Sequence, residues 1–339
     1  MVNGKKLVVS ASPHLRSKKT TTGIMLDVII ALIPALIASF VFFGPRVLAV
    51  TATTVISAVL SEYIARKVMK RHNTIGDLSA VVTGLILAFN LPSTVPLWIA
   101  AVGSVVAIVV VKQFFGGIGQ NFANPAITAR IVLLLSFATK MSGSEWAKPL
   151  AWITKPEVMT TATPLALITD KADELSEIGL VNMLIGNRAG SLGETCTIAL
   201  LIGGIYLIAR KVISFKIPVA YLGSFALIML VAGFVIKRDP VEALTYAAYQ
   251  FMSGGLFLGA FFMATDYATS PINTDGKYIF GIGCGIITAL IRIFGSLPEG
   301  VSFAILIMNL LVPLIERVTT PKPFGTPKKE KKAKEADAK

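Results

Sequence analysis

Long apolar runs alternate with short polar connections along most of this chain. The runs fall at roughly 22–43, 47–66, 78–91, 96–115, 123–139, 195–213, 217–236, 241–264, 277–295 and 299–316. A helix needs about 20 mostly apolar residues to cross the hydrocarbon core of a bilayer. Most of the runs reach this length, whereas the third and the fifth are shorter. The pattern predicts an all-α polytopic membrane protein with ten transmembrane helices.

The ten runs form two groups of five, separated by one long polar stretch. We therefore expect five parts, which are an N-terminal segment 1–21, a first half 22–139, a loop 140–194, a second half 195–318 and a tail 319–339. The first part is polar and basic, so we expect no cleavable signal peptide and expect the first run to remain as an anchor. A composition of 54% hydrophobic and 15% charged residues also favours a membrane protein over a soluble domain.

The charges set the expected orientation. The net charge of +13 lies in short clusters between apolar runs, which is typical of cytoplasmic loops, so we expect no nucleic-acid partner. With the N-terminus inside, 22 lysines and arginines fall on inner segments and four on the short outer loops. The positive-inside rule then predicts that both termini are cytoplasmic and that the loop 140–194 is outside. The charged end "KKEKKAKEADAK" (328–339) indicates a solvated tail with weak attraction to anionic membrane lipid.

The second half repeats motifs of the first. "GLILAFNLPS" (84–93) resembles "GLFLGAFFMATDYATS" (255–270), and "KQFFGGIGQNFA" (112–123) resembles "RIFGSLPEGVSFA" (292–304). These pairs match helices three to five with helices eight to ten, so the halves contain five helices each. Because five is odd, the second half must be inserted in the opposite direction. Inverted repeats are the usual plan of transporters, with sites where interrupted segments meet near the midplane.

The interrupted segments contain the best candidates for a buried polar site. Asn121, Asn124 and Asp266 lie in "GGIGQNFANP" and "TDYATSP", where irregular backbone at membrane depth requires cover from protein or a water-filled cavity. Ionisable groups in or at the ends of spans usually pair or line a pathway. We interpret Asp27 as an interfacial residue and Asp266 as a functional one.

A cluster of threonines stands in the predicted outer loop. "VMTTATPLAL" (158–167) places Thr163 directly before Pro164, which favours an extended backbone with the hydroxyl presented outward. For these residues alone, an ordinary loop is the favoured interpretation.

Cys196 and Cys284 lack metal-ligand spacing, so we expect buried small side chains and no metal site.

Four stretches in order resemble one known family. They are "SPHLRSKKTTTGIMLDVIIALIPA" (12–35), "GGIGQNFANPA" (116–126), "TTATPLAL" (160–167) and "ATDYATSP" (264–271). The family contains the D subunits of the Rnf ion-translocating ferredoxin:NAD+ oxidoreductase and the related B subunits of the sodium-pumping NADH:quinone reductase. The resemblance implies a ten-helix bundle of two inverted halves, similar to urea transporters, in the cytoplasmic (inner) membrane of a bacterium. It also implies redox-driven movement of Na+ or H+, with Rnf subunits A, B, C, E and G as partners.

The resemblance further implies flavin cofactors. In the family, FMN is joined through its phosphate to a threonine at a motif of the form Asp-x-x-Ser/Thr-Gly-Ala-Thr, and a flavin transferase attaches it. Here the matching positions are Glu157, Thr160, Thr161, Ala162 and the acceptor Thr163. Glu replaces Asp and Thr161 replaces Gly, so Thr160 and Thr161 are fallback acceptors. A second, non-covalent flavin, riboflavin, is also implied, without a motif that assigns its residues.

Three alternatives remain open. The B-type protein of a sodium-pumping quinone reductase is less favoured because its N-terminal region is generally longer. A solute channel without a redox cofactor needs only the inverted repeat, and a purely structural scaffold needs none of the threonines.

The glycine-rich stretch "GNRAGSLGE" (186–194) indicates a turn, with contact between Arg188 and a flavin phosphate or a neighbouring protein of the complex as the alternative. The chain has no nicotinamide fingerprint and no iron–sulfur cysteine pattern, so redox partners are obligatory.

Overall fold

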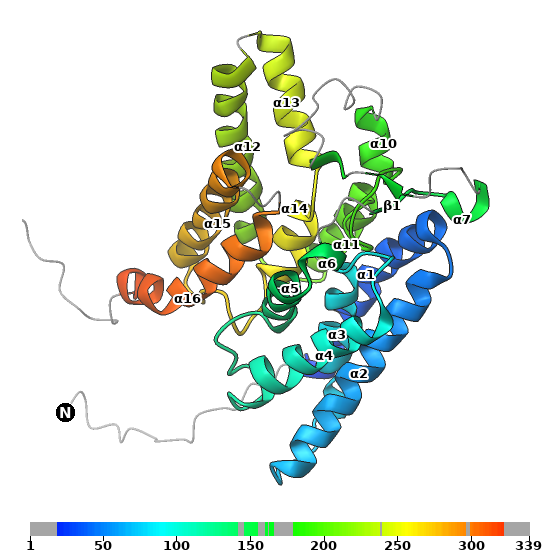
Figure 1. Cartoon of the computed structure of the whole chain (residues 1–339). Helices are drawn as coiled ribbons and strands as arrows, with labels where there is room; N and C mark the ends of the chain where they lie inside the picture. The colour runs from blue at the N-terminus through cyan, green and yellow to red at the C-terminus, as the bar shows by residue number, and fades with distance from the viewer. Residues whose placement is uncertain are drawn as a thin grey trace, which may run out of the picture.

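The computed structural model describes residues 19–141, 146–154, 160–161, 163–165, 179–237, 239–295 and 299–321. Helices dominate this part of the chain (Figure 1). The first half contains α1 (Thr21–Phe43), α2 (Arg46–Val68), the 3-10 turn η1 (Ile75–Asp77), α3 (Ser79–Phe89), α4 (Leu97–Val105) with its π-helical continuation η2 (Val106–Gln113), and α5 (Pro125–Ser136). The second half contains α11 (Thr197–Ala209), α12 (Lys216–Lys237), α13 (Pro240–Met252), α14 (Leu256–Leu258) with its π-helical continuation η3 (Gly259–Met263), α15 (Thr274–Phe294) and α16 (Val301–Thr319).

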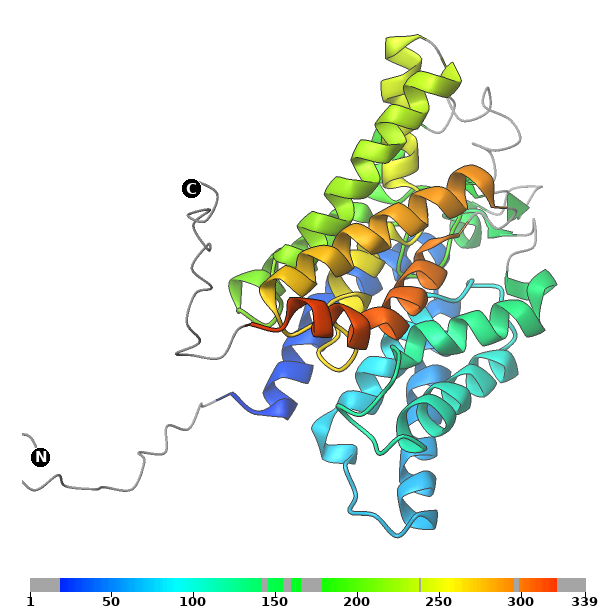
Figure 2. The same ribbon diagram turned by 90° about the vertical axis from the view of Figure 1, so that its left-hand side faces the viewer.

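The helices have the length and composition of membrane spans. Among the described residues, α1, α2, α12, α15 and α16 are each long and apolar enough to cross a bilayer. Four shorter apolar helices accompany them, namely α3, α4 with η2, α5 and α11. The chain is therefore a helical, multi-pass membrane protein. Figure 2 shows α12 and α15 running side by side, and α16 lies against α15.

The connection between the halves is not purely helical. It contains α6 (Ala138–Met141), β1 (Trp146–Ala147), α7 (Ala151–Thr154), β2 (Thr160–Thr161) and α10 (Leu180–Ile185). The two strands pair antiparallel, with Trp146 opposite Thr161. The described chain is thus mostly helical, as predicted, and this pair of two-residue strands is too brief to give a periodic signal in the sequence.

One predicted span is interrupted. Within the apolar run 241–264, α13 ends at Met252. The backbone N–H of Ser253 still donates to the Tyr249 carbonyl, but Ser253 itself is extended, with φ −85° and ψ 151°, and the chain then turns at Gly254 with φ +65°. Glycine tolerates this left-handed conformation without steric cost. The helix restarts at Leu256, so the run consists of two shorter helices joined by a polar turn.

Long-range contacts define one end of the bundle, called here the termini end. Lys19 Nζ donates to the Lys211 carbonyl at 3.1 Å, and Thr22 Oγ1 donates to the Gly76 carbonyl at 3.3 Å. At the other terminus, the backbone N–H of Ile272 donates to Glu316 at 3.0 Å. Lys216 Nζ at the start of α12 donates to Thr274 Oγ1 at the start of α15 at 2.9 Å. The first and last helices therefore reach the same end of the molecule as η1 and the connections after α11 and before α15.

The opposite end is called here the loop end. Arg46 at the start of α2 donates to the carbonyls of Ser93 at 2.8 Å and Val95 at 3.2 Å. The backbone N–H of Leu150 donates to the Phe42 carbonyl at 2.7 Å, so the connection between the halves covers the last turn of α1. The described residues nearest the two termini therefore lie at the opposite end of the bundle from the connection that carries the predicted flavin loop.

Candidate functional site

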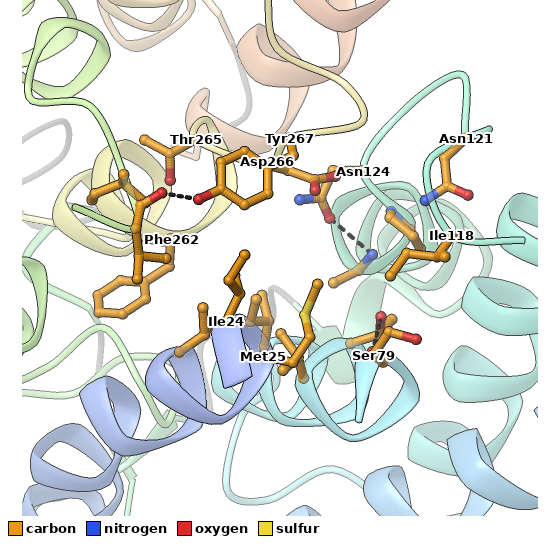
Figure 3. A pocket seen from close by; sticks show the side chains of 18 of the residues that line it. Ile24, Met25, Ser79, Ile118, Asn121, Asn124, Phe262, Thr265, Asp266 and Tyr267 are labelled. Carbon is orange, nitrogen blue, oxygen red and sulfur yellow. Dashed lines mark hydrogen bonds between the residues drawn. The ribbon is translucent and has the colours of Figure 1, made fainter. Parts of the chain in front are cut away.

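A pocket lies among helices from both halves near the termini end (Figure 3). It has a volume of about 100 Å³. Its walls are largely apolar, from residues that include Ile24, Met25, Val82, Ile86 and Phe262. Its polar lining residues are Ser79, Thr83, Lys112, Asn121, Asn124, Thr265, Asp266 and Tyr267. An apolar cavity with a few convergent polar groups is the usual form of a small-molecule site.

Asn124 fixes one wall of the pocket. Its side chain caps α5, since Oδ1 accepts from the backbone N–H of Ala126 at 3.0 Å and of Ile127 at 3.3 Å. Asparagine before proline is a favoured start for a helix, because the amide oxygen satisfies free N–H groups and Pro125 needs none. Its Nδ2 donates to the Met263 carbonyl at 3.2 Å. One residue therefore joins the beginning of α5 to the end of η3.

Asn121 and Asp266 face the same pocket from two connections (Figure 3). Within the described part of the chain, the buried Oδ1 of Asn121 has no hydrogen-bond partner. Asp266 accepts from Thr269 Oγ1 at 3.2 Å. Burial raises the pKa of the Asp266 carboxyl, and hydrogen bonds from Thr269 and the backbone oppose that rise. The pocket thus contains an unpartnered acceptor and a carboxyl whose pKa is raised by burial.

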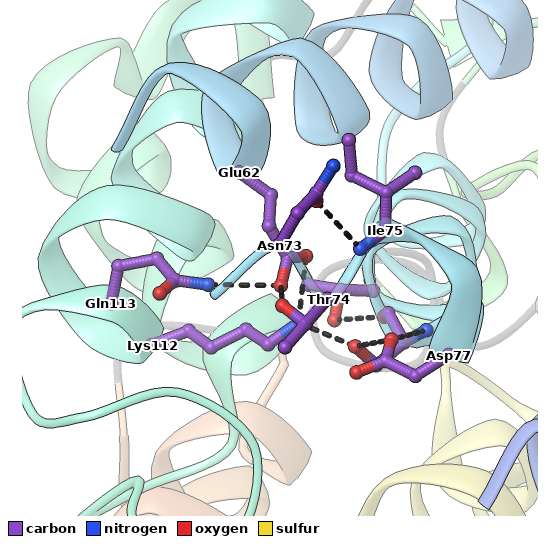
Figure 4. Close-up of polar contacts among 9 residues, drawn as sticks. Glu62, Asn73, Thr74, Ile75, Asp77, Lys112 and Gln113 are labelled. Atoms are coloured by element: carbon purple, nitrogen blue, oxygen red, sulfur yellow. Dashed lines mark hydrogen bonds and ion pairs between the residues drawn. The ribbon is translucent and has the colours of Figure 1, made fainter. Parts of the chain in front are cut away.

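Lys112 brings a compensated positive charge to the pocket (Figure 4). Its Nζ lies 2.9 Å from Glu62 Oε2 and 2.6 Å from Ser79 Oγ. The other oxygen of Glu62 accepts from Thr74 at 2.8 Å and from Gln113 at 2.9 Å. This network ties α2, η2 and the start of α3 together and holds the ammonium group in place.

The sequence analysis did not predict Glu62 as part of a site, and it counted Lys112 only among the basic residues of the inner segments. A single acidic residue inside the apolar run 47–66 was the available signal, because an intramembrane carboxylate normally has a partner. The identity of that partner could not be read from the sequence. By contrast, the structure brings the predicted residues Asn121, Asn124 and Asp266 into one pocket.

The predicted flavin-attachment residue lies elsewhere. Thr163 is partly exposed, and Pro164 and Leu165 after it are buried. Leu165 Cδ2 lies 3.5 Å from the position that a Cβ on Gly254 would take, so this loop packs on the turn between α13 and α14. The fallback residues form β2, opposite β1. Glu157 lies outside the described residues.

The chain is similar along its length to proteins of membrane complexes. The profile of the NQR2, RnfD, RnfE family matches residues 8–325. The D subunit of the Na(+)-translocating ferredoxin:NAD(+) oxidoreductase complex of Acetobacterium woodii is 47% identical over 336 residues, which cover 98% of this chain and 100% of that protein. The D subunit of the proton-translocating ferredoxin:NAD(+) oxidoreductase complex of Clostridium ljungdahlii is 40% identical over 330 residues, covering 94% and 96%. The D subunit of the ion-translocating oxidoreductase complex of Stutzerimonas stutzeri is 36% identical over 332 residues, covering 89% and 91%.

Proposed function

Because the chain belongs to the NQR2, RnfD, RnfE family, we propose that it is a membrane flavoprotein component of a redox-driven ion pump. The pump passes electrons between ferredoxin and NAD+ and moves Na+ or H+ across the membrane. The observation that carries this proposal is the 47% identity over the whole of a relative with that activity. Moving one charge against 100 mV costs about 2.3 kcal/mol, which the redox reaction must supply. The chain works within a multi-protein complex, with the Rnf proteins A, B, C, E and G as the expected partners.

The proposed topology has ten spans in two inverted halves, in a urea-transporter-like arrangement. The apolar helices and the interrupted segments of each half support it. Contacts place the described parts near both termini at one end of the bundle, where the basic connections also lie. We assign this end to the cytoplasm by the positive-inside rule, and the loop end to the outer face of the bacterial inner membrane.

Thr163 is the proposed attachment site for FMN. Its hydroxyl would carry the phosphoester formed by a flavin transferase, and the buried residues Pro164 and Leu165 would hold the attachment point against the bundle. When bound, a flavin accepts and donates electrons singly or in pairs, which suits a link between one-electron and two-electron carriers. The apolar helix surfaces beside the loop would limit access of water.

The pocket at the termini end is the proposed site of a second, non-covalent flavin, expected to be riboflavin. The unpartnered Asn121 Oδ1 can accept a hydrogen bond from a ring N–H or a ribityl hydroxyl. Lys112 places a positive charge at the pocket wall, and Asp266 supplies a carboxyl with a raised pKa. The apolar lining has the chemistry that contacts the faces of an aromatic ring, and the cavity of about 100 Å³ would have to widen to admit a whole flavin.

The test is a denaturing gel viewed under ultraviolet light. The native chain, Thr163→Ala, Thr160→Ala and Thr161→Ala are each co-expressed with a flavin transferase that is active on a known acceptor. We expect a fluorescent band in all of them except Thr163→Ala. A band that persists in Thr163→Ala moves the acceptor to another threonine. A native chain without a band contradicts the flavoprotein assignment and favours a channel without a redox cofactor.

A further inference from the structure

A second cavity lies at the loop end of the bundle, and the proposed function gives it no role. Its volume is about 320 Å³, against about 100 Å³ for the pocket near the termini end. Three segments line it, namely the end of α1 with the turn into α2, the turn after α3, and the connection from β1 to α7. In Figure 1, α7 lies beside the turn between α1 and α2. The cavity is therefore bounded by the first half and by the connection between the halves.

The walls of this cavity are mainly apolar, and the fold holds them in place. They include the rings of Phe42, Phe43 and Trp152. The indole N–H of Trp152 donates to the Val41 carbonyl at 3.1 Å. Gly44, at φ +76°, leaves room for this indole, because a Cβ there would lie 2.7 Å from Trp152 Cγ. An apolar cavity offers water few hydrogen-bond partners, so an apolar group is its natural occupant.

All three tryptophans of the chain lie at this end of the bundle. Trp152 lines the cavity, and Trp146 precedes the lining residue Ala147 in β1. Trp98 lies in the first turn of α4, just after the carbonyls that Arg46 contacts. Tryptophan is enriched where a bilayer meets water, and α1 and α2, which meet at the cavity, are both long enough to span a bilayer. The cavity therefore lies at the depth where lipid headgroups join their acyl chains.

Two exposed cations line the same cavity, Arg46 and Lys148. Arg46 donates from Nε and Nη2 to the carbonyls between Ser93 and Val95, and its Nη1 has no hydrogen bond to a described residue. Among the residues that the structure describes, no carboxylate lies within 4.0 Å of either cation. Arg46 is also one of the few cations that the positive-inside rule assigns to a short outer loop. The cavity thus combines apolar walls with uncompensated positive charge.

Phospholipids have the matching chemistry and are present at this depth. An acyl chain suits the apolar walls, and a phosphate is an anion that guanidinium and ammonium groups bind through charge-assisted hydrogen bonds. A free phosphate would occupy only the charged part. We propose that this cavity is a binding site for an anionic phospholipid, with an acyl chain along Trp152 and the phosphate at Arg46 and Lys148. The site goes beyond the proposed flavin chemistry and does not depend on it.

The cations decide which phospholipid is bound. Every phospholipid offers an acyl chain, and a chain that moves from the bilayer into the cavity exchanges one apolar environment for another. An anionic headgroup gains in addition from the positive charge, by about fivefold in affinity for each Lys or Arg near the membrane surface. The site should therefore prefer phosphatidylglycerol to phosphatidylcholine, and salt should weaken the preference by screening exposed charges.

The experiment uses the full chain with one tryptophan in bilayers of phosphatidylcholine. Trp98→Phe with Trp146→Phe leaves Trp152 as the reporter. Trp146→Phe with Trp152→Phe leaves Trp98 as the matched control, because Trp98 is 57% exposed at the same end and does not line the cavity. A minor fraction of the lipid is phosphatidylglycerol or phosphatidylcholine with brominated acyl chains, and bromine quenches an indole only at close range. Each protein is prepared with and without a co-expressed flavin transferase.

We expect brominated phosphatidylglycerol to quench Trp152 at a fraction at least about fivefold lower than brominated phosphatidylcholine. Both lipids should quench Trp98 alike. In the Trp152 reporter, Arg46→Gln and Lys148→Gln should each reduce the preference by about fivefold. Lys148 is exposed, so Lys148→Gln removes charge without disturbing the carbonyl contacts of Arg46, and it decides the matter if Arg46→Gln does not accumulate.

Equal quenching of Trp152 by the two lipids would overturn the proposal, since Trp152 would then contact only bulk lipid. A preference that survives Lys148→Gln unchanged would overturn the role of the cations and with it the site. The proposal also fails if brominated lipid reaches Trp98 but never Trp152, because protein then fills the cavity. Quenching of Trp152 that is lost only when the transferase is present would assign the cavity to an attached flavin instead of a lipid.

Discussion

Lys112 Nζ lies 2.9 Å from Glu62 Oε2, and the two side chains are 2% and 0% exposed. This ion pair connects η2 to α2 beside the pocket, and Glu62 also receives hydrogen bonds from Thr74 and Gln113. A buried pair of this kind contributes little relative to apolar residues of the same shape. Removing one partner is costly, however, because it leaves the other charge buried and alone.

Glu62→Gln is therefore expected to lower the free energy of unfolding by about 3–5 kcal/mol. Asp27→Asn is the control, because Asp27 pairs with Arg210 at 3.3 Å where the arginine is 59% exposed, and such pairs contribute at most about 1 kcal/mol. Denaturant unfolding in detergent measures both. Equal effects of the two substitutions would show that the Glu62 pair is not desolvated as the structure describes.

Close packing of α1 on α11 depends on Gly203. A Cβ at this position would collide with the carbonyl oxygen of Ala31 and lie 3.0 Å from Phe262. Because backbone cannot move aside cheaply, Gly203→Ala is expected to lower the free energy of unfolding by about 1–3 kcal/mol. Gly223 on α12 has nothing within 4 Å of its Cβ position, so Gly223→Ala should be neutral or stabilising by up to about 1 kcal/mol. Thermal unfolding of the two variants side by side checks the difference.

Substitutions of Asn121 and Asn124 are expected to have different effects: the first should weaken ligand binding, and the second should lower stability. Asn121 Oδ1 is buried and has no partner among the described residues, so Asn121→Ala should not lower the free energy of unfolding. Loss of one hydrogen bond to a pocket-bound flavin should weaken its retention by about tenfold. Asn124→Ala removes a helix cap and should cost about 1 kcal/mol of stability.

Chromatography of flavin released from the purified protein measures this retention, with the covalent flavin as the internal reference. Unchanged retention in Asn121→Ala, at native stability, would remove Asn121 from the proposed second flavin site.

The raised pKa of Asp266 predicts how stability depends on pH. The folded chain holds this proton to a higher pH than the unfolded chain, whose aspartate pKa is about 3.9. Between the two pKa values the folded state binds more protons, so the contribution of Asp266 to stability falls as pH rises and stays low above the folded pKa. Asp266→Asn should therefore gain thermal stability relative to the native chain at neutral pH. That gain should shrink as the pH approaches 4, and a difference that is constant with pH would contradict the prediction.

Much of the candidate site could be read from local sequence. Asn121, Asn124 and Asp266 were predicted because amides and an acid in glycine-interrupted apolar segments are unusual, and they line one pocket. Glu62 was missed because a single acid in an apolar helix does not identify its partner, which lies 50 residues away. The proposed acceptor Thr163 was predicted from its resemblance to a family motif, whereas the packing of Leu165 against Gly254 was not predicted.

The sequence by itself determined the membrane environment, most helix positions and the family, because each depends on composition and order within short stretches. Tertiary structure decided which polar groups meet. The pairs Glu62 with Lys112, Asn124 with Met263, and Leu165 with Gly254 each join segments that are distant in the chain. No local pattern encodes these contacts, because they form only when helices of both halves pack together and bring distant residues into contact. Only the assembled bundle shows that Lys112 has its carboxylate and that Arg292, its counterpart in the predicted repeat, donates to backbone carbonyls instead.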